Sequence, residues 1–104
     1  MLLYGEGVAS FGVPVEVLNY IVPPSQAVRL KSLICWGDTP GEYEIYIDSI
    51  LRGGIRTSDQ KRTDQVWWGS TFIANENEEV VIVATHHSTG MRALKCNLEL
   101  DRLT

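Results

Sequence analysis

Apolar and polar residues alternate along several short segments of this chain, and this alternation predicts β-strands. Between residues 41 and 48, Tyr43, Ile45 and Ile47 alternate with polar or charged neighbours. A segment of this kind has one dry face and one wet face, which is typical of a strand that covers a core.

The preceding segment, residues 27–36, alternates as well. Its two predicted faces carry Val28, Leu30 and Ile34 on one side, and Arg29, Lys31, Leu33 and Cys35 on the other. Residues 37–41, "GDTPG", contain Asp, Pro and two glycines, which favour a turn. We therefore expect the segments before and after this turn to form a hairpin.

Later segments add further strands. Residues 80–87, "VVIVATHH", are the most apolar run and predict a central strand. Residues 91–100 alternate again, and the positions expected to face inward are Leu94, Cys96, Leu98 and Leu100. The remaining expectations are a short strand through 50–55, a polar loop over 56–65, a strand over 66–73 and a turn over 74–79.

The N-terminal part is interrupted by Pro14, which cannot donate a hydrogen bond within a sheet. Residues 7–21 therefore predict either one edge strand or two short strands bent at 12–14. Helical periodicity is nearly absent from the sequence. These patterns predict a single all-β domain, an antiparallel, jelly-roll-like β-sandwich of at least six strands. We expect residues 1–21 to form an N-terminal arm and edge strand, and residues 22–104 to form the sandwich.

Length and composition restrict the partners. The 104 residues suit one domain with its own core, and 44% hydrophobic residues is an ordinary globular content. The net charge of −4 argues against nucleic acid and anionic membranes as partners, because phosphate binding requires a surplus of basic side chains. The start of the chain lacks the pattern of a signal peptide, so we expect synthesis and folding in the cytoplasm.

Cys35 and Cys96 both lie in strand-like segments beside apolar neighbours. Buried free thiols are the interpretation that fits a reducing compartment, and a disulfide is the alternative. We expect the two cysteines to be unlinked.

Candidate chemistry begins with His86 and His87. Neighbouring side chains of a strand point to opposite faces, so the two cannot chelate one metal ion, and we expect one to be half-buried and the other exposed at a strand end. No zinc-ligand spacing, nucleophile elbow or phosphate-binding loop is present in the sequence. We therefore predict no catalytic residue, metal or cofactor, and a protein that is not an enzyme.

The remaining candidates are interface residues. Trp67 and Trp68 are adjacent on a predicted strand, so that one points inward and the other outward; parity does not decide which. An exposed tryptophan can anchor a protein interface or stack on a sugar ring. The full set of interface candidates consists of both tryptophans, a basic group and an apolar N-terminal group: Trp67, Trp68, Arg52, Arg56, Lys61, Arg62, Leu2, Leu3, Tyr4 and Phe11.

Over residues 22–100 the order of segments resembles small β-sandwich proteins of tailed-bacteriophage virions. The motifs that carry the likeness are a proline-marked strand start, "VPPS", the segment "EYEIYIDSIL", and an apolar strand that ends in "THHSTG" before a final strand. Two positions depart from the usual layout, "NENEE" before the apolar strand and "IDSIL" in the hairpin.

This resemblance implies a non-enzymatic structural protein, a capsid cement or decoration protein that stabilises the particle. Its implied partners are the major capsid protein or other virion proteins, and it is expected to form a homo-oligomer, with a trimer favoured. The implied localisation is the virion, after synthesis in the host bacterial cytoplasm. The alternatives are a tail or baseplate accessory protein and a carbohydrate-binding module that uses exposed tryptophans; an intracellular cupin-like protein is a third.

Overall fold

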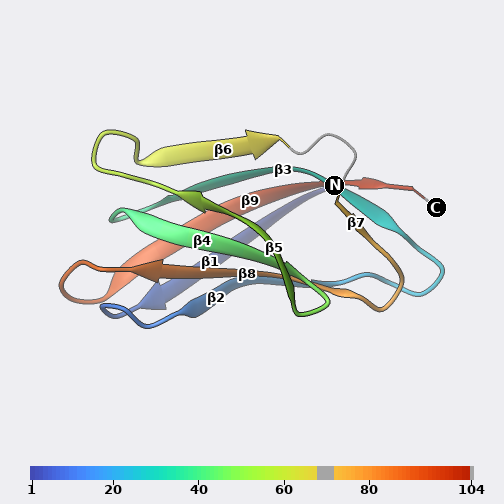
Figure 1. Cartoon of the computed structure of the whole chain (residues 1–104), viewed down its shortest axis with the longest axis horizontal. Coiled ribbons are helices and arrows are strands. Elements are labelled where there is room, and N and C mark those ends of the chain that lie inside the picture. The colour runs from blue at the N-terminus through green and yellow to red at the C-terminus, as the bar shows by residue number, and fades with distance from the viewer. Residues whose placement is uncertain (68–71, 104) are drawn as a thin grey trace.

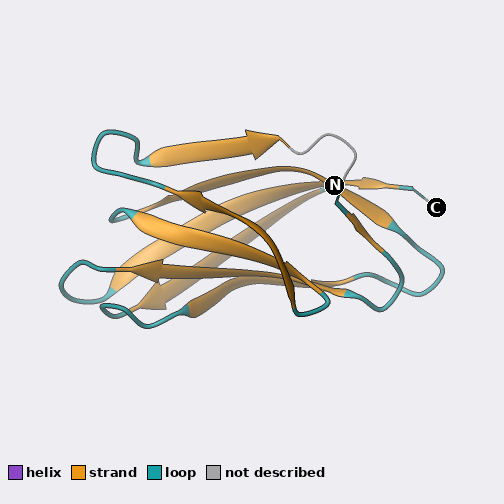
Figure 2. Ribbon diagram, viewed as in Figure 1, coloured by secondary structure: helices purple, strands orange, loops and turns teal. Residues whose placement is uncertain are grey.

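Two antiparallel β-sheets pack face to face in the computed structural model of the chain, which describes residues 1–67 and 72–103 (Figures 1 and 2). Nine strands lie within these ranges: β1 (Leu2–Ala9), β2 (Val15–Ile21), β3 (Val28–Gly37), β4 (Gly41–Ile47), β5 (Ile50–Arg56), β6 (Thr63–Trp67), β7 (Ile73–Ala74), β8 (Glu79–His86) and β9 (Arg92–Arg102). The described residues contain no helix, and hence none that is long and apolar enough to cross a bilayer. The predicted β-sandwich is confirmed.

The strands are shared between the sheets in an order that crosses the sandwich repeatedly. Sheet A has the order β1-β9-β3-β6, with β7 also paired to β3, and sheet B has the order β2-β8-β4-β5. Every pairing is antiparallel. The predicted central strand is confirmed, because β8 lies between β2 and β4.

The core lies between the sheets and is built from alternate residues of each strand. In β9 the inward positions were predicted correctly, and Leu94, Cys96, Leu98 and Leu100 are all fully buried. Tyr43 crosses the core from sheet B, and its hydroxyl donates a hydrogen bond to the backbone oxygen of Trp36 in sheet A at 2.7 Å. This bond joins the two layers.

The predicted hairpin through residues 37–41 is wrong. β3 belongs to sheet A and β4 to sheet B, so the turn carries the chain from one sheet to the other. The residues of this turn favour a reversal of the chain, but they do not determine whether the next strand joins the same sheet or the opposite one. The hairpin partner of β4 is β5, across Asp48 and Ser49, which both have positive φ.

The predicted faces of β3 hold only for its first half. The pairing with β9 shifts between Leu30 and Ser32, and this β-bulge reverses which side chains face inward. As a result Leu33 and Cys35 are fully buried, whereas Ile34 is only half-buried. The expectation that Ile34 faces the core and that Leu33 and Cys35 face away from it is therefore wrong.

Two predicted boundaries change, and one open alternative is resolved. Residues 2–9, expected to belong to an N-terminal arm, form β1 and pair with β9 along their whole length. The segment 7–21 is two strands, as the second of its two interpretations predicted. The polar loop ends before β6 begins at Thr63, so it is shorter than the expected 56–65, and part of the predicted strand 66–73 lies outside the described residues.

Candidate interaction surfaces

The outer side of β1 exposes a row of apolar side chains. Leu2, Tyr4 and Val8 are 67%, 56% and 53% exposed, because alternate residues of this strand point away from the core. Two strands away, in β3, the ring of Trp36 lies 6.1 Å from the ring of Tyr4 at an angle of 44°. We call these four residues the β1 patch.

Polar groups frame the aromatic pair of the β1 patch. The Tyr4 hydroxyl donates a hydrogen bond to Glu6 Oε2 at 3.1 Å, and Lys95 Nζ lies 4.0 Å from Glu6 Oε1. Asn97 pairs with Tyr4 across the β1–β9 ladder. The surface therefore combines an apolar platform with a carboxylate, an ammonium group and an amide, all placed by the regular ladder of sheet A.

Loops from both sheets meet at one end of the sandwich, where His86 connects them. Its ring is fully buried, and Nε2 lies 2.6 Å from the backbone oxygen of Ala9, while the Ser88 N–H donates to Nδ1 at 3.1 Å. Since Nδ1 accepts a bond, we assign the proton to Nε2, which donates to Ala9. The side chain thus ties the end of β1 to the β8–β9 loop.

The neighbouring histidine has the opposite environment. His87 is exposed, and its ring meets that of Phe11 edge-on, with centroids 5.5 Å apart. The prediction of one exposed histidine at a strand end is confirmed, whereas the other, His86, is fully buried and not half-buried as expected. Among residues 1–67 and 72–103, no group of three or more histidine, cysteine or acidic residues could hold a metal ion.

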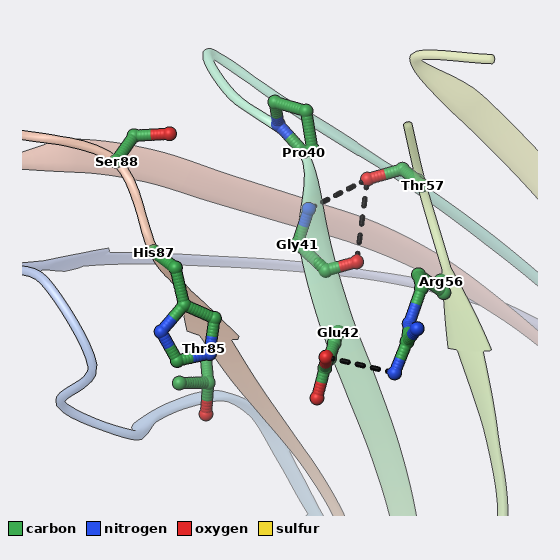
Figure 3. Close-up of a pocket in the computed structure, with 8 residues that line it drawn as sticks. All are labelled: Pro40, Gly41, Glu42, Arg56, Thr57, Thr85, His87 and Ser88. Atoms are coloured by element: carbon green, nitrogen blue, oxygen red, sulfur yellow. Dashed lines mark hydrogen bonds and ion pairs between the residues drawn. The ribbon is translucent and has the colours of Figure 1, made fainter. Parts of the chain in front are cut away.

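A shallow pocket of about 200 Å³ opens beside His87 (Figure 3). Its lining comes from the β3–β4 turn, the start of β4, the end of β5 with the residue after it, the end of β8 and the β8–β9 loop: Pro40, Gly41, Glu42, Arg56, Thr57, Thr85, His87 and Ser88. The ends of β4 and β5 are held together by the Thr57 hydroxyl, which accepts a bond from the Gly41 N–H at 2.8 Å.

Most polar groups of this pocket already have partners within the chain. Arg56 forms an ion pair with Glu42 at 2.9 Å, as the dashed line in Figure 3 shows. The Ser88 hydroxyl shares a hydrogen bond with that of Thr39. Much of the polar lining of this pocket therefore serves to hold the loops and strand ends together.

The basic interface candidates are spread over β5 and the loop that follows it, and most are neutralised. Besides the Arg56 pair, Lys61 lies 2.9 Å from Asp64, and Arg62 lies 3.3 Å from Asp59 and donates to the backbone oxygen of Asp38. The amine of Lys61 also lowers the pKa of Asp64 through its hydrogen bond. Arg52 is exposed, and it forms no hydrogen bond or ion pair with another of the residues that the structure describes.

The apolar and aromatic candidates have different positions. Leu2 and Tyr4 belong to the β1 patch, Phe11 is 61% exposed beside His87, and Leu3 packs against the core. Trp67 is the last residue of β6, where its backbone pairs with Ser32, and Trp68 lies outside the described residues. Sequence reasoning missed Trp36 as a surface residue, because the bulge that turns it outward has no sequence signal.

Cys35 and Cys96 face each other across the β3–β9 ladder and are both free and fully buried. Burial raises the pKa of both thiols, that of Cys96 to about 12. Neither thiol is therefore a nucleophile at neutral pH.

Comparisons with known proteins add little to this description. No family model matches the chain, and no curated protein matches it. Among solved structures, the insecticidal delta-endotoxin Cry8Ea1 from Bacillus thuringiensis is similar with a TM-score of 0.47 and 12% sequence identity. The match covers 99% of this chain and 20% of the toxin, so the chain spans about a fifth of that structure. A likeness of this size gives no information about what the chain binds.

Proposed function

We propose that this chain is a non-enzymatic structural protein that acts through protein–protein contact, as a capsid cement or decoration protein of a tailed-bacteriophage virion. The observation that carries the proposal is the β1 patch. Leu2, Tyr4 and Val8 are all more than half exposed on one side of one strand. Glu6 lies between Tyr4 and Val8 on the same face, so the apolar surface is centred on the Tyr4–Trp36 pair; an exposed apolar patch marks a candidate interaction site.

The composition of the β1 patch supports a protein partner. Tyrosine and tryptophan are enriched among residues that dominate binding energy, because they bury a large area with few rotatable bonds. Tyr4 and Trp36 supply this pair, and Glu6 and Lys95 supply a polar rim. The resemblance of segment order over residues 22–100 points to the virion as the setting.

Attachment of purified protein to particles that lack it tests the proposal. We expect Tyr4→Ala to weaken attachment about fivefold or more, in the range of ~1–3 kcal/mol for a residue at the centre of an interface. Tyr46→Ala is the matched control, because Tyr46 is a half-buried tyrosine on the outer face of sheet B. Equal attachment of wild type and Tyr4→Ala, or no attachment of the wild type, would contradict the proposal.

Carbohydrate binding is a second candidate, favoured by the geometry of the aromatic pair. The Tyr4 and Trp36 rings form a small platform beside the carboxylate of Glu6 and the amine of Lys95, groups that can bond to sugar hydroxyls. A glycan array distinguishes the candidates: saturable sugar binding that Tyr4→Ala abolishes supports the module, and particle attachment that free sugars leave unchanged supports the structural role.

A further inference from the structure

β5 forms one border of sheet B and has an unpaired side. Among the described residues it pairs with β4 alone, because it stands at the end of the strand order of sheet B (Figure 1). The backbone N–H and C=O groups on its other side therefore have no strand partner. Such an edge is a template for a strand of another chain unless it is blocked.

Two glycines leave the middle of this edge without side chains. A Cβ atom built on Gly53 would meet no heavy atom within 4 Å. Next to it, a shallow hollow of about 260 Å³ lies over Gly54 and is bordered by Glu42, Glu44 and Arg56. Because Gly53 and Gly54 have no side chains, the backbone of another chain and one of its long side chains have room to approach this edge.

Two oppositely charged side chains lie near these glycines, and neither forms an ion pair within the described part of the chain. Glu44 is the cross-strand neighbour of Gly54, and it takes part in none of the ion pairs of the described residues, in contrast to Glu42, which pairs with Arg56. Arg52 is exposed at the bulge of β5, has no cross-strand neighbour in β4, and is likewise without an ion-pair partner in the described ranges. This side of sheet B thus presents the cation of Arg52 on β5 and the carboxylate of Glu44 on β4, and neither forms an ion pair within the described residues.

We propose that two copies of this chain associate by pairing their β5 strands antiparallel about a twofold axis at Gly53. In this register Gly53 lies opposite Gly53 of the second copy, and Arg52 lies opposite Gly54 of the second copy. The guanidinium then extends over the hollow to Glu44 of the second copy. Twofold symmetry repeats the contact, because a single surface carries both the donor and the acceptor.

Two exposed apolar residues flank the contact. Ile50 and Leu51 are 54% and 53% exposed at the start of β5. The bulge at Arg52 ends the regular register, so they lie beside the end of the paired segment and not within it. The charge complementarity selects a second copy as the occupant over an unrelated chain.

Sedimentation equilibrium of the full chain tests this pairing. We expect a dimer, and we expect Glu44→Arg or Arg52→Glu alone to raise the dimer dissociation constant about tenfold or more, because each places like charges across the interface. The double variant Glu44→Arg with Arg52→Glu restores the opposite charges and should restore the dimer. Lys31→Glu, a charge reversal on the outer face of sheet A, is the control and should leave the mass unchanged.

Far-ultraviolet circular dichroism checks that each variant is folded. If one single variant is unstable, recovery of the dimer in the double variant still tests the pairing. A monomer at high concentration, a trimer, or a dimer unaffected by both single reversals overturns the proposal. So does a failure of the double variant to recover. This inference goes beyond the proposed function and can fail separately from it, because Tyr4 lies on the other sheet.

Discussion

The β1–β2 edge of the sandwich is tightly packed and the β5 edge is open, and two glycines show the difference. At the β1–β2 edge, a Cβ atom on Gly5 would lie 2.1 Å from the backbone oxygen of Val17. At the β5 edge, the same atom on Gly53 would meet nothing within 4 Å. Because Gly5 has no Cβ atom, the two sheets can come into contact at the first edge. At the second edge the missing Cβ atom of Gly53 leaves open space beside the strand.

The contrast separates residues that hold the fold together from residues that are free to bind. At the first edge the end of β1 is fixed by His86, and the Gly12 N–H donates to the backbone oxygen of His86 at 2.7 Å. At the second edge, exposed side chains such as Arg52 and Leu51 make no comparable contacts within the described part of the chain. Substitutions at the first edge should therefore change stability, and those at the second should change association.

The largest expected effect is that of Gly5→Ala. The added methyl group overlaps the backbone of β2, which cannot move away as a flexible side chain could, so the sheets must separate. We expect a loss of more than about 3 kcal/mol in the free energy of unfolding. Gly53→Ala is the matched control and should change it by less than about 0.5 kcal/mol. Urea titration followed by circular dichroism measures both, and equal losses would remove the distinction between the edges.

His86→Ala should have the next largest effect. The substitution leaves the Ala9 carbonyl and the Ser88 N–H without their partner and empties a fully buried site. We expect a loss of about 2–3 kcal/mol, since each unsatisfied buried group costs about 1–3 kcal/mol and water can replace part of the contact. The exposed neighbour provides the control, and His87→Ala should cost less than about 0.5 kcal/mol. A neutral His86→Ala would show that the histidine does not secure this end of the sandwich.

The buried thiol of Cys96, next to the β1–β2 edge, leads us to expect a loss of stability in alkali. Cys96 is the cross-strand neighbour of Gly5, and burial raises its pKa to about 12. An unfolded thiol ionises near pH 8.5, so the unfolded state releases its proton first, and stability that is complete below this pH is lost as the pH rises toward the folded pKa. Between about pH 8 and pH 10 this amounts to about 2 kcal/mol for one thiol.

Denaturant titrations of wild type and Cys96→Ala at the two pH values test this prediction. The variant should lose less stability than the wild type over the interval, because it no longer has that thiol to ionise on unfolding. Identical pH dependence would mean that water reaches Cys96 in the folded protein.

The two central strands of sheet A, β9 and β3, show what the sequence could and could not predict. In β9 a regular alternation extends over the whole strand, so the buried set from Leu94 to Leu100 could be predicted directly. In β3 the same reasoning failed after Leu30, because a one-residue bulge exchanges the faces and leaves no mark in the residue types. The bulge is also what makes Trp36 available to the β1 patch.

The candidate surfaces were predictable in parts. Leu2 and Tyr4 were identified because an apolar N-terminus is unusual unless it docks, although the sequence did not show that they belong to a strand. The pairing of Glu42 with Arg56 depends on the register of β4 and β5, and that register is set across a bulge. The partner of β3 could not be predicted either, because turn residues indicate a reversal and not the sheet to which the chain returns.

The smallest expected effect concerns an ion pair near the open edge. Lys61 and Asp64 lie 2.9 Å apart, and a hydrogen bond from Lys61 lowers the pKa of Asp64. Since the folded pKa lies below the unfolded one, the pair stabilises the fold above the unfolded value, and this contribution is lost as the pH falls through the folded pKa. Lys61 is largely exposed, so solvent screens the pair, and we expect Lys61→Met to cost about 0.5 kcal/mol or less at neutral pH. Thermal unfolding should separate the variant from the wild type slightly at neutral pH and not at all near pH 2, about two units below the usual aspartate pKa. A difference that persists in acid would show that the Lys61 side chain stabilises the loop by packing. A cost well above the expected range would show that the β5 edge contributes to folding as the β1–β2 edge does.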